Sequence, residues 1–472
     1  STLPSPKSDG SGTLLFAKSA FPLSRTRPPN ALVYSRLQNA GKQKGRIFMT
    51  RIAPRWRRTL AVALAGISML SVTAASAAEI VVWCWDPNFN GATMQEAFSR
   101  YQAEHPDDTI NVVIFDKAAM EQKLQAQLAS GSTDGLPDIV LIEDYRAQKY
   151  LQSFPSAFEP LNNYIDYSTF APYKVELATL NGQTYSLPFD SGVTGYFYRT
   201  DLLAEAGFGP EDLENITWDQ LIEIGKTVKE KTGQILLPID PTGSDWIRIM
   251  LQSAGSWYFD ADGNVTIAGN PVFKAALETY QRLIASGITT PVSGWTEYTG
   301  SFTSGKTLST FSGVWMTATI KANPDQAGKW GVAPSPRLDG VEGAGNASNL
   351  GGSSWYVLSS APQKEMAIDF LATVWAKDVD FYQKILVNQG ALGSLLAARE
   401  GEAYQASDDF FSGQPVWQNF SAWLAEIPAV NYGIFTEEAD AAVVAQVPAL
   451  TSGGNVDDII AAIDAQVRQQ TQ

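Results

Sequence analysis

The chain has 472 residues, of which 44% are hydrophobic and 18% charged, which excludes an intrinsically disordered protein and suits two or three folded domains. A single Cys and a single His exclude an intramolecular disulfide, a CxxC metal site and a His-rich metal centre. The formal net charge of −15 argues against nucleic acid as a partner.

The first 77 residues differ from the rest in charge. They hold 12 Lys and Arg and one acid, whereas the remainder holds the other 22 of the 34 basic and 48 of the 49 acidic residues. Met49 precedes an arginine-rich stretch, an apolar core at 60–70 and an A-x-A motif ending at Ala77. That core of about 11 residues is shorter than the roughly 20 needed to span a bilayer, which disfavours a membrane anchor. We therefore predict a signal peptide at 49–77, cleaved after about Ala77, and a disordered upstream extension at 1–48, with Met49 as the true start.

From residue 78 the chain alternates predicted strands and helices. Continuous apolar runs predict strands at 80–85, 110–115 and 138–142, the first buried on both faces. The pattern Thr93-Met94-Gln95-Glu96 predicts a capping box and a helix, and a second helix ends at Gly131. The inward positions of these two helices are Met94, Ala97, Phe98, Tyr101, Met120, Leu124 and Leu128. The order strand, helix, strand, helix, strand indicates a parallel sheet with helices on both faces.

Three later segments have clear local patterns. A second capping box at 217–220 predicts a helix, and residues 259–265 predict a hairpin. A late helix is predicted near 367–374. The lone Cys84 is expected to be a buried small hydrophobe.

Two motifs resemble ligand sites but fail their context tests. Residues 300–307 match G-x-x-x-x-G-K-[ST], yet a phosphate loop must open a helix, and 308–315 is predicted to be a strand. Residues 260–264 hint at a calcium loop, but Gly263 is fourth rather than sixth, so a hairpin turn is the better interpretation. We therefore expect no nucleotide, no metal and no other cofactor.

The chain from 78 onward resembles the extracellular solute-binding proteins of bacterial ABC importers, in the sugar-binding group that includes maltose-binding proteins. The resemblance rests on the order and spacing of several segments. The detailed sequence of these segments is similar to that of the lactose-binding members. The segments are IVVWCWDPN from Ile80, LPDIVLIED at 136–144, LPFDSGVTGYFYRTDLLAEAGF at 187–208, TWDQL at 217–221, FTSGKTLSTFSGVW at 302–315 and GGSSWYVLSSAPQKEMAIDFL at 351–371.

This resemblance implies an α/β protein of two discontinuous lobes that close on a sugar about a hinge. Lobe 1 would comprise 78–190 with 352–395 returning to it, and lobe 2 would comprise 191–351 with 396–472. The crossings would fall near 190–192 and 350–352, with a third near 390–393, where small residues can absorb a change of φ and ψ. It further implies a monomer, exported to the periplasm, that delivers a disaccharide or oligosaccharide (lactose or a related galactoside) to permease subunits in the inner membrane.

Sugars need carboxylates, amides and guanidinium groups at their hydroxyl edges and flat aromatics at their ring faces. The rule that ligands bind beyond the carboxyl ends of strands selects residues after the first and third predicted strands, namely Trp85, Asp86, Asn88, Glu143, Asp144 and Tyr145. Asp190 and Gly352 lie at the implied hinge, and Trp315 resembles the stacking Trp of the family. The further candidates are Asp245, Trp257, Trp295, Arg399, Trp417 and Tyr432.

Other interpretations remain open at this stage. Each Trp could equally be a core residue, and Glu143 and Asp144 point opposite ways, so the sequence does not say which one faces a cleft. An exported carbohydrate-active hydrolase is the alternative function, because 48 acids supply many carboxylate pairs. Docking to a chemoreceptor would be compatible with binding. His105 is expected to be solvated at a helix end, and we predict no enzymatic activity.

Overall fold

The computed structural model describes residues 78–471. The chain divides into two units, Ser1–Thr73 and Ala74–Gln472, and the described residues all belong to the second. The predicted upstream extension, signal peptide and cleavage site therefore lie outside the described residues. Within 78–471, no helix combines the length and the apolar character that crossing a bilayer requires.

The described chain begins with the predicted alternation of strands and helices. Its elements are β1 (Glu79–Cys84), α1 (Asn90–Tyr101), β2 (Thr109–Ile114), α2 (Lys117–Ser130) and β3 (Ile139–Glu143). β1 lies between β2 and β3 and is parallel to both, with Val82 opposite Val112 and Ile139. The carboxyl ends of the three strands therefore meet at one edge of the sheet, as the sequence predicted.

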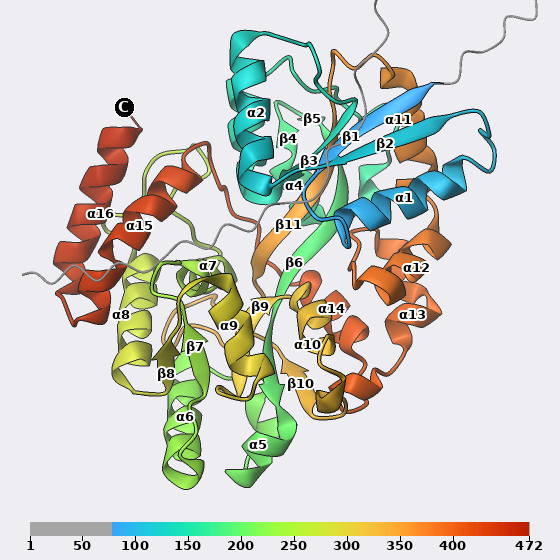
Figure 1. Cartoon of the computed structure of the whole chain (residues 1–472). Coiled ribbons are helices and arrows are strands. Elements are labelled where there is room, and N and C mark those ends of the chain that lie inside the picture. Colours follow the sequence, from blue (N-terminus) through green and yellow to red (C-terminus); the bar gives the residue numbers. More distant parts are fainter. Residues whose placement is uncertain (1–77, 472) are drawn as a thin grey trace, which may run out of the picture. The chain divides into compact units, whose positions relative to one another are not determined.

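Two long strands extend this sheet. β6 (Ser186–Arg199) and β11 (Asn349–Val357) are antiparallel to each other, and β11 is also antiparallel to β3. Beyond Val193, β6 pairs with β9 (Ser309–Gly313) and β10 (Trp330–Ala333). Figure 1 shows β6 and β11 side by side, leading from the β1–β3 region toward β9 and β10. The pair thus connects two groups of elements that are far apart in sequence.

The remaining elements pack around these strands. Between β3 and β6 the chain forms α3 (Ala147–Ser153), α4 (Pro172–Leu177), β4 (Thr179–Leu180) and β5 (Gln183–Thr184). Between β6 and β11 lie α5 (Thr200–Glu205), α6 (Trp218–Thr232), β7 (Leu237–Ile239), α7 (Asp245–Ser253), α8 (Pro271–Ala285), β8 (Thr289–Pro291), α9 (Gly294–Thr303) and α10 (Met316–Lys321). After β11 come α11 (Lys364–Phe370), α12 (Val379–Gln389), α13 (Glu402–Gln405), α14 (Val416–Leu424), α15 (Thr436–Thr451) and α16 (Val456–Gln470).

The hydrophobic core explains the continuous apolar runs. Alternate residues of β1 point to opposite faces, so Ile80, Val82 and Cys84 join the larger core cluster and Trp83 joins a smaller one on the other face. Cys84 is fully buried, as predicted, and burial raises the pKa of its thiol to about 12. The predicted late helix is α11 followed by a π-helical turn at Leu371–Trp375, and it buries Ala367, Phe370, Leu371 and Val374.

One of the two predicted helix starts is wrong. The capping box at Thr217 is present, with the Thr217 and Gln220 side chains each bonding the other residue's backbone N–H. By contrast, α1 begins at Asn90, and the Thr93 hydroxyl donates back to the Phe89 carbonyl at 2.6 Å. A turn closed by the Gly91 N–H on the Asp86 carbonyl starts this helix earlier than the motif predicted.

The two rejected motifs have the predicted local structures. Gly300 lies inside α9 and Lys306 in the turn that leads into β9, so this segment ends a helix and is followed by a strand, as predicted. Asp260 accepts the backbone N–H groups of Asp262 and Asn264 in a turn bridged by Phe259 and Val265. Among residues 78–471, no three His, Cys, Asp or Glu side chains are arranged to hold a metal ion.

Candidate functional site

A cleft of about 710 Å³ lies where the carboxyl ends of β1 and β3 approach β6 and β11. The cleft is defined here by its lining residues, which come from both groups of elements. Eight of the residues predicted from the sequence line it: Trp85, Asp86, Asn88, Glu143, Asp190, Trp315, Gly352 and Trp417. A larger open groove of about 1080 Å³ runs along α6, but no predicted site residue lines it. The cleft therefore holds the candidate site.

The turn after β1 shapes one wall of the cleft. Asp86 Oδ1 accepts the backbone N–H groups of Asn88 at 2.8 Å and Phe89 at 2.9 Å, and the Asp86 N–H donates to Asn90 Oδ1 at 3.0 Å. One carboxylate oxygen of Asp86 is thus committed to holding the turn. Asn88 is exposed at its tip.

Lys117 is a cleft residue that the sequence reasoning missed. Its Nζ lies 2.6 Å from Glu143 Oε2 and 5.3 Å from the centre of the Trp85 ring. Lys117 is the first residue of α2, directly after β2, so the strand-end rule could have found it had it been applied to that strand. Because the cation lies over the Trp85 ring, it occupies part of that ring's face.

Asp190 occupies the point where β6 pairs with β11 and bridges to Gly393. Its side chain is buried, and Oδ1 accepts the Ser353 hydroxyl at 2.5 Å. Burial raises the pKa of the Asp190 carboxyl, and the Lys174 charge and the hydrogen bonds from Ser353 oppose that rise. The carboxylate is therefore fixed in position while still lining the cleft.

Two tryptophans face the cleft from the other side. Trp315 follows β9 and is partly exposed, and its Nε1–H donates to the Leu350 carbonyl at 3.0 Å. A Cβ on Gly351 would lie 3.2 Å from that nitrogen, so the glycine lets the indole pack against β11. Trp417 on α14 is only 8% exposed and therefore offers the cleft little of its surface. The Trp315 indole is therefore anchored at its edge while it lines the cleft.

The side chains of Glu143 and Asp144, the adjacent acids at the end of β3, point in different directions, as the alternation of side chains along a strand requires. Glu143 lines the cleft, whereas Asp144 is buried against Lys174, whose Nζ lies 2.7 Å from Asp144 Oδ1. Burial raises the pKa of Asp144 to about 6, although Lys174 opposes the shift. The sequence could state that the two carboxylates diverge but not which one faces the cleft.

Three predicted aromatics form a cluster outside the cleft lining. Tyr145 stacks on Trp257 at 6.4 Å and meets Tyr432 edge to face at 5.0 Å, and the Arg248 guanidinium lies 4.8 Å from the Tyr145 ring centre. The Tyr145 hydroxyl accepts the Gly351 N–H at 2.7 Å. These residues support β11 from behind the cleft lining.

The other candidates are not brought to the cleft. Asp245 is exposed at the start of α7 and pairs with Arg248. Arg399, in the 3₁₀ turn Leu396–Glu400, is partly buried, and its Nε and Nη2 have no hydrogen-bond partner among the described residues. The side chain of Trp295 lies outside what the structure describes. His105 is partly exposed and stacks on Tyr101 at 4.0 Å.

β6 and β11 connect the group of elements around β1–β3 with the group around β9 and β10, and residues of both groups line the cleft. This arrangement defines a two-lobed α/β binding protein. Residues 96–411 match the model of the bacterial extracellular solute-binding protein family, and the chain belongs to this family. The chain is 59% identical, over 82% of its length and 92% of the relative's, to a lactose-binding protein of Rhizobium radiobacter.

Solved structures agree on the fold. The galacto-N-biose/lacto-N-biose I-binding protein of an ABC transporter from Bifidobacterium longum matches with a TM-score of 0.69 at 21% identity, covering 84% of this chain and 97% of the other. The GacH receptor of Streptomyces glaucescens matches with a TM-score of 0.70 at 19% identity, covering 83% and 98%. The predicted fold class, a two-lobe periplasmic binding protein, is confirmed.

Proposed function

We propose that this chain is the sugar-binding component of a bacterial ABC importer, with lactose or a related galactoside as its ligand. The single observation that carries the proposal is that one cleft is lined by the Asp190 and Glu143 carboxylates together with the Trp315 indole. Carboxylates accept sugar hydroxyls, and an indole face covers the apolar face of the ring. The 59% identity to a lactose-binding protein supports the choice of sugar.

The lobes follow from where the strands change partners. We assign 78–190 with 352–395 to lobe 1, and 191–351 with 396–472 to lobe 2. The change in β6 pairing after Val193 and the bridge from Asp190 to Gly393 support crossings near 190–192, 350–352 and 390–393. A sugar that touches Trp85 in one lobe and Trp315 in the other stabilises the closed state by its differential affinity.

Delivery then needs no chemistry within the cleft. The protein is a monomer exported to the periplasm, and permease subunits in the inner membrane recognise the closed form. A glycosidase needs one carboxylic acid and one carboxylate free to act on the bond. Here Asp190 is held by Ser353 and Glu143 by Lys117, which supports binding without turnover.

Titration calorimetry with lactose, other galactosides, maltose and monosaccharides tests the ligand. We expect a saturable heat with lactose or a galactoside, and chromatography of the mixture should return the sugar intact. Absence of heat with every sugar would contradict the proposed function, and hydrolysis products would favour the alternative of an exported hydrolase.

Trp315→Ala tests the site itself. We expect an affinity loss of about tenfold, equal to about 1.4 kcal/mol, because the variant removes the ring contact. Trp423→Ala is the matched control, since Trp423 is also partly exposed but packs on Phe420, outside the cleft lining. Equal affinities for the two variants would remove Trp315 from the site.

A further inference from the structure

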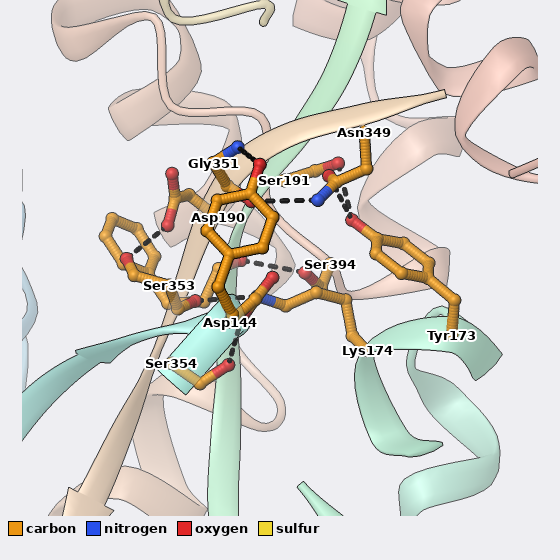
Figure 2. Close-up of polar contacts among 12 residues, drawn as sticks. Asp144, Tyr173, Lys174, Asp190, Ser191, Asn349, Gly351, Ser353, Ser354 and Ser394 are labelled. Carbon is orange, nitrogen blue, oxygen red and sulfur yellow. Dashed lines mark hydrogen bonds and ion pairs between the residues drawn. The ribbon is translucent and has the colours of Figure 1, made fainter. Parts of the chain in front are cut away.

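An ion pair is fully enclosed directly beneath the cleft. Lys174 on α4 is 0% exposed and Asp144, at the end of β3, is 3% exposed. Lys174 Nζ lies 2.7 Å from Asp144 Oδ1 and 2.8 Å from Oδ2. Neither residue lines the cleft, and Figure 2 shows Lys174 pointing at Asp144 below Asp190.

The third partner of the lysine is the strand that holds the cleft carboxylate. Lys174 Nζ donates to the main-chain carbonyl of Ser353 at 2.8 Å, and the Ser353 hydroxyl donates to Asp190 Oδ1 at 2.5 Å. A continuous series of contacts therefore runs from the buried pair through one residue of β11 to a carboxylate in the cleft (Figure 2).

The backbone of β11 is closely fitted to this pair. Gly352 has a φ of +89°, and a Cβ there would lie 2.5 Å from Asp144 Oδ2. The pairing of β11 with β6 also shifts register on both sides of Gly352–Ser353. On its other edge β11 pairs in regular register with β3, with Ser353 opposite Glu143, so the contact from Lys174 adds to the ladder in positioning Ser353 where the β6 pairing is irregular.

We propose that Lys174 and Asp144 are positioning residues for ligand binding: they hold the Ser353 carbonyl so that the Ser353 hydroxyl keeps the Asp190 carboxylate aimed into the cleft. The inference rests on the proposed sugar-binding function. Stability alone is a weak reason for such a pair, since replacing a buried ion pair by neutral residues of similar volume is often neutral or stabilising.

A double-mutant cycle separates this role from a merely structural one. The variants are K174M/D144N, D190N and the triple variant K174M/D144N/D190N, each titrated with the sugar that wild type binds best. We expect K174M/D144N to lose about tenfold in affinity, the scale of a charge-assisted hydrogen bond. The triple variant should bind within about threefold of D190N, because the pair acts through Asp190.

A control variant with the same charge change tests for a general effect. R199M/D201N removes the pair at the far end of β6, where Arg199 Nη2 lies 2.6 Å from Asp201 Oδ2, and should leave sugar affinity within about twofold of wild type. If thermal unfolding experiments show that K174M/D144N is not folded, K174Q/D144N takes its place in the cycle. Both replacements are neutral amides, so this variant removes the charges of the pair while keeping polar side chains of similar size.

The results are distinguishable from a failure of the proposed function. A wild-type protein that binds no sugar refutes the proposed function. If wild type binds a sugar, but the affinity loss of the triple variant equals the product of the losses of K174M/D144N and D190N, only the positioning role is overturned. Unchanged affinity in the Lys174/Asp144 variant that folds overturns it equally.

Discussion

Replacing Gly192 with alanine should both destabilise the protein and weaken ligand binding. A Cβ at this position on β6 would lie 2.4 Å from the Leu350 oxygen, 2.6 Å from the Leu350 carbon and 2.7 Å from the Gly351 carbon. All three are backbone atoms of β11, so no side chain can rotate away. Restoring the 3.0 Å that real Cβ contacts keep requires a backbone shift of about 0.6 Å.

Overpacking of this kind costs about 1–3 kcal/mol, and we expect the upper part of that range because the obstacle is backbone. The Leu350 oxygen also accepts the Trp315 indole N–H, so its displacement moves the ring in the cleft. Urea unfolding should therefore show a free-energy loss of about 2–3 kcal/mol, and calorimetry a weaker affinity for the sugar.

Gly300→Ala is the matched control. Gly300 lies inside α9, and nothing lies within 4 Å of a Cβ placed there. The exchange should leave stability unchanged or raise it by about 0.5–1 kcal/mol, as alanine favours helices. If Gly192→Ala unfolds within about 0.5 kcal/mol of wild type, the close approach of β6 and β11 is not the constraint argued here.

Three further outcomes are expected. Sugar affinity should fall as pH drops through the raised pKa of Asp190, because the ionised carboxylate accepts hydroxyl hydrogen bonds more strongly than the protonated carboxyl does, and Asp190→Asn should remove this contribution to the pH profile. Tyr145→Phe leaves the part-buried Gly351 N–H without its acceptor and should cost about 1–2 kcal/mol in urea unfolding, whereas no loss would contradict the 2.7 Å bond. Glu437→Gln breaks a partly exposed pair with Arg146 at 2.6 Å, and its effect on unfolding should stay below about 1 kcal/mol and diminish in high salt.

The sequence predicted the parts of the fold that rest on local patterns. The three apolar runs became β1, β2 and β3; β1 and β3 are largely buried, as strands inside a sheet covered on both faces are, whereas β2 is a partly exposed edge strand. Thr93 shows the limit of a motif, since an adjacent turn started α1 before the capping pattern. The strand-end rule found Trp85 and Glu143 because it follows from topology alone.

The rest of the site depends on contacts across long sequence distances. Lys174 meets Ser353 and Ser353 meets Asp190 only through the folded strands, so no spacing in the sequence marks them. Trp257 and Tyr432, predicted as ligand residues, meet edge to face at 4.8 Å outside the cleft lining, and their role stays a prediction. Aromatic side chains suit both roles, and only the fold separates them.

Four consecutive residues of β11 tie the candidate site to the strand crossing. The Leu350 carbonyl holds Trp315, the Gly351 N–H holds Tyr145, Gly352 leaves room for Asp144, and Ser353 holds Asp190. Two positive-φ glycines allow the backbone to present these groups in different directions over so short a distance. Motion of β11 against β6 would therefore act on the contacts of both the Trp315 ring and the Asp190 carboxylate, which is the coupling that a hinged binding protein requires between its ligand and its conformation.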